Sequence, residues 1–136
     1  MRGWITVASL AVTVLAACGA PPQSSAPPSR NARAMQSAEA GTLGEPALVE
    51  FYAADCITCN NIRSEISALD VRYDGKVKFI YLDTDLAEAQ PYLAKYNVRG
   101  LPTFALLDRR GRMVSSMSGW RGEQAVTDAL SALVAQ

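Results

Sequence analysis

Two cysteines separated by two residues, Cys56 and Cys59, stand where an apolar run meets a helical pattern, and this junction constrains the chain most. The preceding residues 46–53 are rich in β-branched and aromatic side chains and form a run short enough for a buried strand. Beyond the pair, apolar residues recur at steps of three and four through Ile66 and Leu69, which predicts one face of a helix. The sequence therefore predicts a strand, a turn carrying two thiols, and a helix.

The two thiols are expected to differ in exposure and reactivity. The helical phase puts Cys59 on the core side and leaves Cys56 at the helix N-terminus, nearer to solvent. Unpaired backbone N–H groups and the positive end of the helix dipole favour a thiolate at that position. A free thiol has a pKa of about 8.5, and sites of this kind lower it by one to several units. Cys56 is therefore expected to be the more reactive thiol.

Composition excludes several classes of site. The chain has 136 residues, which is enough for one domain with a core, and its formal charge of zero gives no indication of a nucleic-acid partner. It contains no histidine, so histidine-based catalytic triads, histidine zinc sites and haem ligation by histidine are excluded. Three cysteines is an odd number, which needs an explanation in an exported protein.

The N-terminal residues are expected to be an export signal. Arg2 precedes a mostly apolar run that ends in small residues, and at about 15 residues the run is short for a bilayer span. The end of the run, Leu15-Ala16-Ala17-Cys18, resembles the lipobox of bacterial lipoproteins, which implies cleavage before Cys18 and lipidation of that residue. Lipidation also accounts for the odd cysteine count. An ordinary secretory signal with an incidental Cys18 is the alternative.

The chain is expected to divide into three parts. A lipoprotein signal peptide covers residues 1–17, and the lipidated cysteine and a Pro/Ser-rich tether cover residues 18–44. A short helix through Ala34, Met35 and Ala38 is the alternative for residues 34–44, but Gly41 and Gly44 argue against much order there. The folded domain is expected at residues 45–136.

The folded part alternates strand and helix, which is typical of an α/β domain with a central sheet, here of about four strands. Further strands are expected at residues 77–82, 103–107 and 112–117, the last two joined by a hairpin turn. Helices are expected at residues 86–96 and around Val126, Leu130 and Leu133. Pro91 predicts a kink or a late start in the first of these helices.

This order of elements and motifs resembles the thioredoxin family. A Cys-x-x-Cys motif alone also begins many zinc sites, so further matches are needed. Phe51-x-Ala53 precedes Cys56 as in thioredoxins, and Gly-Leu-Pro-Thr at residues 100–103 resembles the family's cis-proline loop. Gly119 follows the last strand where the family also has a glycine. In detail the chain looks similar to membrane-linked, extracytoplasmic thioredoxin domains such as the C-terminal domain of DsbD.

The resemblance implies a thioredoxin fold in which a loop with a cis Pro102 faces the N-terminus of the Cys56 helix. It also implies thiol–disulfide exchange, in which Cys56 attacks a substrate disulfide and Cys59 resolves the mixed disulfide. Glu50 matches the family's buried acid, whose raised pKa suits a proton acceptor; a solvent-facing position on an edge is the alternative. The redox-active disulfide would need no further cofactor and no metal.

A shallow apolar groove beside the cysteine pair is a further implication of the resemblance. An extended substrate strand would pair there with the backbone of Leu101. The residues expected to border this groove are Ile57, Leu101, Gly119 and Trp120. For Trp120, packing as an ordinary core or surface aromatic residue is the alternative.

The chain departs from the family pattern beside the cysteine pair. Asp55 stands where thioredoxins usually carry tryptophan; as an N-cap it could bond the N–H of Ile57 or Thr58, and its charge should disfavour the Cys56 thiolate. Tyr81 occupies the place of a lysine near the buried acid, so the proton path is expected to differ.

The sequence thus predicts an oxidoreductase that is lipid-anchored to a bacterial membrane and faces the periplasm or the cell exterior. The reductase direction is favoured because Asp55 disfavours a very stable thiolate. Its expected partners are disulfide-bearing proteins, the membrane, and an integral-membrane thiol electron donor, since that compartment keeps no reducing glutathione pool. Two alternatives are a Cu(I) chaperone that uses both thiolates and a redox-inactive interaction module on the same fold.

Overall fold

The computed structural model describes residues 27–136, so the predicted signal peptide and Cys18 lie outside the described part of the chain. Its elements, in chain order, are α1 (Arg30–Glu39), β1 (Ala47–Tyr52), α2 (Ile57–Asn61), α3 (Arg63–Arg72), β2 (Lys78–Asp83), α4 (Gln90–Lys95), β3 (Thr103–Leu107), β4 (Met113–Ser118) and α5 (Glu123–Val134). Within these residues no helix has the length and apolar character that crossing a bilayer requires.

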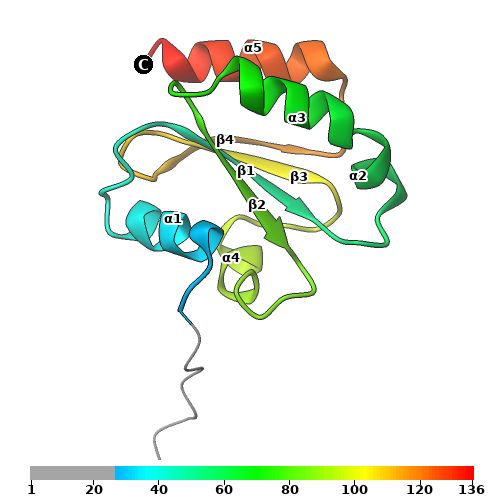
Figure 1. Cartoon of the computed structure of the whole chain (residues 1–136), viewed down its shortest axis with the longest axis horizontal. Helices are drawn as coiled ribbons and strands as arrows, with labels where there is room; N and C mark the ends of the chain where they lie inside the picture. The colour runs from blue at the N-terminus through cyan, green and yellow to red at the C-terminus, as the bar shows by residue number, and fades with distance from the viewer. Residues whose placement is uncertain (1–26) are drawn as a thin grey trace, which may run out of the picture.

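Within the described residues, four strands form one mixed sheet in the order β2-β1-β3-β4. β1 runs parallel to β2, whereas β3 runs antiparallel to both β1 and β4. Parallel neighbours need a long crossover, and α2 and α3 provide it between β1 and β2. Helices α3 and α5 cover one face of the sheet, and α1 and α4 lie against the other (Figure 1). This is the predicted mixed sheet flanked by helices.

The core lies on both faces of the sheet, and β1 is buried along most of its length. Alternation along the strand sends Val49 and Phe51 into the cluster with α1 and α4, and sends Leu48 into the cluster with α3 and α5. Glu50 has the same parity as Leu48 and lines a cavity with side chains of α3. A single carboxylate therefore enters the otherwise apolar layer between the sheet and α3.

The folded part begins earlier than predicted, because residues 30–44 are not a tether. α1 packs on the sheet with Met35 fully buried. The side-chain amide of Asn31 donates to the backbone oxygen of Tyr81 at 2.7 Å, which ties the helix to β2. Gly41 follows the helix at a φ of 71°, in the left-handed region that glycine adopts without strain. The glycine therefore ends the helix and turns the chain toward β1, and it does not prevent order.

The helix after the cysteine pair is interrupted once. α2 and α3 meet at Ile62, whose ψ of 3° departs from the helical value although its N–H still bonds the carbonyl of Thr58 at 3.1 Å. The predicted buried face continues across this interruption. Its members, each at most 4% exposed, are Cys59, Ile62, Ile66 and Leu69.

α4 is shorter than the helix expected at residues 86–96, and it starts late as Pro91 predicts. Turns occupy the preceding residues. The N–H of Leu86 donates to the carbonyl of Asp83, and the N–H of Ala89 donates to the carbonyl of Leu86, each at 3.1 Å. Pro91 lies in the first turn, where a missing N–H costs no intrahelical hydrogen bond.

Candidate active site

The predicted cysteine pair forms a disulfide. Cys56 and Cys59 are joined by an S–S bond of 2.05 Å, and their Cα atoms are 5.3 Å apart. β1 ends at Tyr52, and a short turn brings Cys56 to the N-cap position of α2. Cys59 is 3% exposed, whereas Cys56 is half-buried. One cysteine is thus open to the surface and the other faces the core, as the helical phase predicts.

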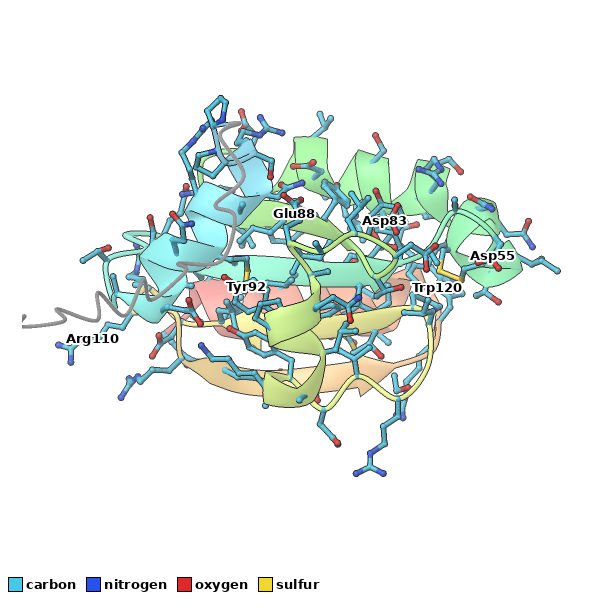
Figure 2. All side chains as sticks on the ribbon, turned by 90° about the horizontal axis from the view of Figure 1, so that it is seen from below. Asp55, Asp83, Glu88, Tyr92, Arg110 and Trp120 are labelled. Atoms are coloured by element: carbon cyan, nitrogen blue, oxygen red, sulfur yellow. A yellow bond between two sulfur atoms is a disulfide. The ribbon has the colours of Figure 1, made fainter. Side chains whose placement is uncertain are left out.

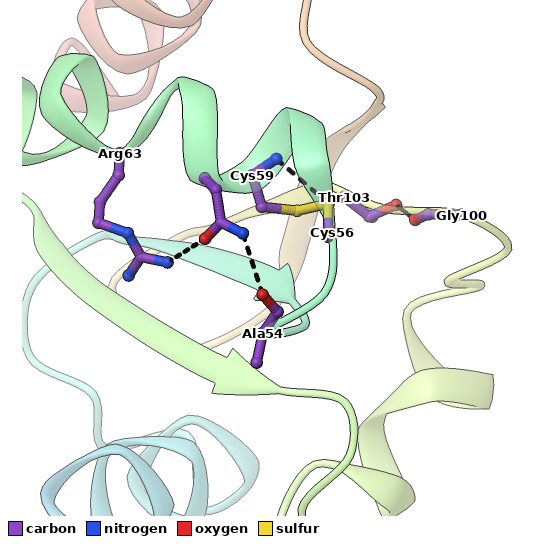
Figure 3. The surroundings of a disulfide bond; sticks show 7 residues. Ala54, Cys56, Cys59, Arg63, Gly100 and Thr103 are labelled. Atoms are coloured by element: carbon purple, nitrogen blue, oxygen red, sulfur yellow. Dashed lines mark hydrogen bonds between the residues drawn. A yellow bond between two sulfur atoms is a disulfide. The ribbon is translucent and has the colours of Figure 1, made fainter.

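Hydrogen bonds hold the turn around Cys56. The backbone N–H of Cys59 donates to the sulfur of Cys56 at 3.2 Å. The side-chain amide of Asn60 donates to the carbonyl of Ala54 at 2.9 Å, which fixes the turn before the pair (Figure 3). The expectation that Asp55 caps the helix is wrong, because the helix begins one residue later and Cys56 itself is the N-cap. The Asp55 side chain is exposed beside the pair.

The loop before β3 lies at the same end of the sheet as the cysteine pair. Thr103 pairs with Phe51 in the sheet, so the preceding residues lie beside the segment that leaves β1. The Leu101–Pro102 bond is cis, as the resemblance implies, and Pro102 is buried. The hydroxyl of Thr103 donates to the carbonyl of Gly100 at 2.7 Å and closes the loop beside the disulfide (Figure 3). The structure therefore brings the proline loop to the cysteine turn.

The segment after β4 joins this arrangement. The N–H of Gly119 donates to the carbonyl of Pro102 at 2.7 Å. Trp120 is half-buried, and its ring centroid lies 6.3 Å from that of Phe104. Trp120 thus packs on the core, and it does so at the end of the molecule that carries the disulfide and Asp55 (Figure 2).

Two apolar residues near the pair differ in exposure. Ile57, directly after Cys56, is 76% exposed. Leu101 is half-buried and packs against the cluster formed with α1 and α4. A side chain so exposed contributes little to the packing of the core. The substrate contacts of both residues remain predictions.

A cavity of about 290 Å³ lies beneath the pair. Its lining residues are Glu50, Tyr52, Cys59, Arg63, Ile66, Ser67, Asp70 and Tyr81. Glu50 is 6% exposed, so the alternative of a solvent-facing residue is wrong. Burial raises the pKa of Glu50 to about 7, and the charge of Arg63 works in the opposite direction. A carboxyl group with that pKa can accept and return a proton near neutral pH, and it shares its cavity with Cys59.

Tyr81 stands beside Glu50 where the family pattern has a lysine. The two residues are register partners on neighbouring strands, and both line the cavity. The hydroxyl of Tyr81 donates to a carboxylate oxygen of Asp70 at 2.9 Å. Burial, and then this hydrogen bond, raise the pKa of Tyr81, so the phenol is neutral at physiological pH. An uncharged phenol bonded to a carboxylate therefore stands where the resemblance implies a lysine.

Arg63 was not among the residues expected at the site. It follows Cys59 by four residues, so it lies one helical turn further along the same side, and this spacing was the available signal. Its guanidinium donates to the side-chain oxygen of Asn60 at 2.6 Å (Figure 3). Arg63 is thus linked to the cysteine turn as well as to the cavity.

Comparisons with known proteins show that this chain is similar to thioredoxins. The Thioredoxin family model matches residues 37–132. The thioredoxin-like protein HCF164 of Arabidopsis thaliana is 33% identical over 104 residues, covering 76% of this chain and 40% of the relative. A TxlA homolog from Synechocystis sp., named a thiol:disulfide interchange protein, is 34% identical over 103 residues, covering 76% of this chain and 57% of the relative. The chain thus spans about half the length of these curated relatives.

Solved structures agree on the fold. The thioredoxin Deadhead of Drosophila melanogaster superposes with a TM-score of 0.62 at 26% identity, covering 74% of this chain and 89% of that one. Oxidised mitochondrial thioredoxin 3 of Saccharomyces cerevisiae has the same TM-score at 21% identity and shows the fold alone, covering 72% of this chain and 88% of that one. The finer resemblance to the DsbD domain is not tested by these matches and stays a prediction.

Proposed function

Because the chain belongs to the thioredoxin family, we propose that it is a thiol–disulfide oxidoreductase that reduces protein disulfides through Cys56 and Cys59. The observation that carries this proposal is the disulfide itself, with one cysteine open to the surface and one buried in the wall of the cavity that Glu50 also lines. The name of the TxlA homolog, a thiol:disulfide interchange protein, supports the same reaction type.

The reaction needs a reduced pair. The thiolate of Cys56 attacks one sulfur of a substrate disulfide, and the other substrate sulfur leaves as a thiolate that takes up a proton. Cys59 then attacks Cys56, the bond between Cys56 and the substrate breaks, and the second substrate thiol is released. Two electrons pass from the cysteine pair to the substrate, and the pair ends as the disulfide seen in the structure.

Each cysteine has a neighbour suited to its role. The N–H of Cys59 that donates to the sulfur of Cys56 would stabilise negative charge on that sulfur in the reduced form. Glu50 would take the proton of Cys59, since the two side chains line one cavity. Pro102 borders the same turn, and the backbone of Leu101 before it would pair with the substrate strand beside Cys56.

Insulin reduction by the full chain with dithiothreitol as electron source tests this function. The chain should accelerate insulin precipitation, and Cys56→Ser and Cys59→Ser should each abolish turnover. Cys18→Ser makes the same atomic change outside the pair and should leave turnover intact. A chain that is folded yet no faster than dithiothreitol alone would refute the proposal.

The reductase direction is tested by the redox potential. Asp55 supports it, because an exposed carboxylate beside Cys56 disfavours the very stable thiolate of strong oxidants. Equilibration with glutathione or dithiothreitol buffers measures the potential. A value near that of thioredoxin, about −270 mV, agrees with a reductase, and a value near −120 mV rejects that direction.

Membrane anchoring is part of the proposal and is supported by the lipobox-like sequence before Cys18. The domain would then work outside the cytoplasm and take electrons from an integral-membrane thiol carrier. Metabolic labelling with a radioactive fatty acid in a bacterial host tests the anchor. Label on the wild type and none on Cys18→Ser is expected, whereas an unlabelled wild type that is cleaved and secreted would favour an ordinary signal peptide.

A further inference from the structure

We propose that Arg63 is a positioning residue for the resolving step: its positive charge beside the cavity favours the state in which Cys59 and Glu50 together carry one negative charge. This inference rests on the proposed function, because it assigns a role within the same exchange reaction.

The first observation is where the guanidinium lies and what holds it. Arg63 lines the cavity together with Glu50 and Cys59. Its nitrogen bonds the neutral side-chain oxygen of Asn60 at 2.6 Å, and Asn60 in turn bonds the turn before Cys56. Within residues 27–136 Arg63 takes part in none of the ion pairs. Its guanidinium is therefore oriented by an amide and is not engaged by a carboxylate in an ion pair within 4.0 Å in this part of the chain.

The other charged and titratable groups that face Glu50 do not supply a cation. They are Tyr52 on β1, Cys59 on α2, Asp70 on α3 and Tyr81 on β2. Tyr81 is neutral and donates to Asp70, and burial followed by the charge of Asp83 raises the pKa of Tyr52, so this phenol is neutral too. Arg63 is the cation among the residues that line the cavity.

The chemistry of the resolving step explains why a cation matters there. The Cys59 thiol gives its proton to the Glu50 carboxylate, and the resulting thiolate attacks the sulfur of Cys56. The Cys56–Cys59 bond forms while the bond to the substrate breaks, and the substrate sulfur leaves with the electron pair and is protonated by water. The Cys59–Glu50 pair carries one negative charge wherever the proton lies. A cation beside the cavity lowers the pH at which that charge appears.

Burial disfavours this negative charge, whereas the positive charge of Arg63 favours it. The charge of Arg63 lowers the pKa of Glu50, whereas burial raises it to the resulting value of about 7. Without the guanidinium, Glu50 would hold its proton to higher pH and would be a base in a smaller fraction of molecules at pH 7. In this chain α3 thus provides the positive charge at the cavity.

Dithionitrobenzoate separates the resolving step from the first attack. In a Cys18→Ser background, the reduced full chain should release one coloured thiolate at a rate that depends on reagent concentration, as Cys56 reacts. A second coloured thiolate should follow at a rate that is independent of reagent concentration, because Cys59 attacks the mixed disulfide at Cys56 within the same molecule. Stopped-flow absorbance gives the second rate as a function of pH.

Arg63→Gln should move the midpoint of this pH profile upward and slow the second phase about three- to tenfold at pH 7, with recovery at higher pH. Arg63→Lys should stay within about twofold of the parent chain, because it keeps the charge. Arg72→Gln is the matched control: it removes the same charge from the same helix, where the arginine pairs with Glu123 at 3.0 Å. In a Glu50→Gln background, Arg63→Gln should have a smaller effect.

An unshifted profile in Arg63→Gln would overturn the proposal. So would an equal shift in Arg72→Gln, or a lysine variant as slow as the glutamine variant. A parent chain that releases no second thiolate would instead refute the exchange reaction itself, so the two failures are distinguishable.

Discussion

Replacing Glu50 by glutamine should stabilise the oxidised protein, and increasingly so as the pH rises. Burial raises the pKa of Glu50 from 4.5 to about 7, so between these values the folded protein holds a proton that the unfolded chain releases. The favourable contribution of the protonated carboxyl is complete below pH 4.5 and is lost as the pH rises through 7. Glutamine carries no ionisable proton and escapes this loss.

The size of the effect follows from the same interval. At about 1.4 kcal/mol per pH unit, the interval from 4.5 to about 7 corresponds to roughly 3 kcal/mol. A domain of this size has a free energy of unfolding of about 5–15 kcal/mol, so the change is large enough to measure.

Urea unfolding of the oxidised full chain at a series of pH values gives the difference in free energy between Glu50→Gln and wild type. We expect a difference near zero at about pH 4 that grows to roughly 3 kcal/mol at about pH 8. Asp74→Asn removes an exposed carboxylate and controls for the loss of one negative charge. A difference that does not change with pH, or a variant less stable than wild type at pH 8, would show that Glu50 is not a buried carboxyl group with a raised pKa.

Three further predictions concern other parts of the molecule. Met35→Ala should lower the free energy of unfolding by about 2–5 kcal/mol in urea, because it empties a buried site under α1; an unchanged midpoint would mean that α1 is not part of the fold. Gly111→Ala should destabilise more than Gly75→Ala: both glycines have positive φ, but a Cβ at Gly111 would collide with the backbone of Ala38, whereas the space at Gly75 is open. Equal thermal midpoints for the two variants would contradict the close approach of the hairpin to α1. Ile57→Ser should change stability by no more than about 0.5 kcal/mol yet lower kcat/KM for protein disulfides, since the side chain is 76% exposed beside Cys56; unchanged kinetics would remove Ile57 from the groove.

Much of the fold was predictable because its signals are local. The apolar run at β1, the buried face through Ile66 and Leu69, and the late start at Pro91 each follow from periodicity or from one residue's geometry. The cysteine turn and the cis Pro102 followed from short motifs that the family shares. These parts depend little on contacts between distant segments.

The features that could not be predicted from the sequence depend on contacts between segments that lie far apart in the chain. α1 presents too few large apolar residues to predict a packed helix, and its place is set by Met35 in the core and by Asn31 bonding the edge of β2. Alternation gave Glu50 the same face as Leu48, but only the packing of α3 over β1 shows how deeply it is buried. The spacing of four residues from Cys59 was a signal for Arg63, but only the packing of α3 over β1 shows that Arg63 lines the same cavity as Glu50.

Trapping a mixed disulfide shows whether Cys56 is the attacking thiol and Cys59 the resolving one. The reduced Cys59→Ser chain is mixed with oxidised insulin, quenched with acid and mapped by mass spectrometry, with Cys56→Ser treated in parallel. We expect a one-to-one adduct through Cys56 in the first variant and none in the second. No adduct from Cys59→Ser, or an equal adduct through Cys59 in Cys56→Ser, would contradict these roles.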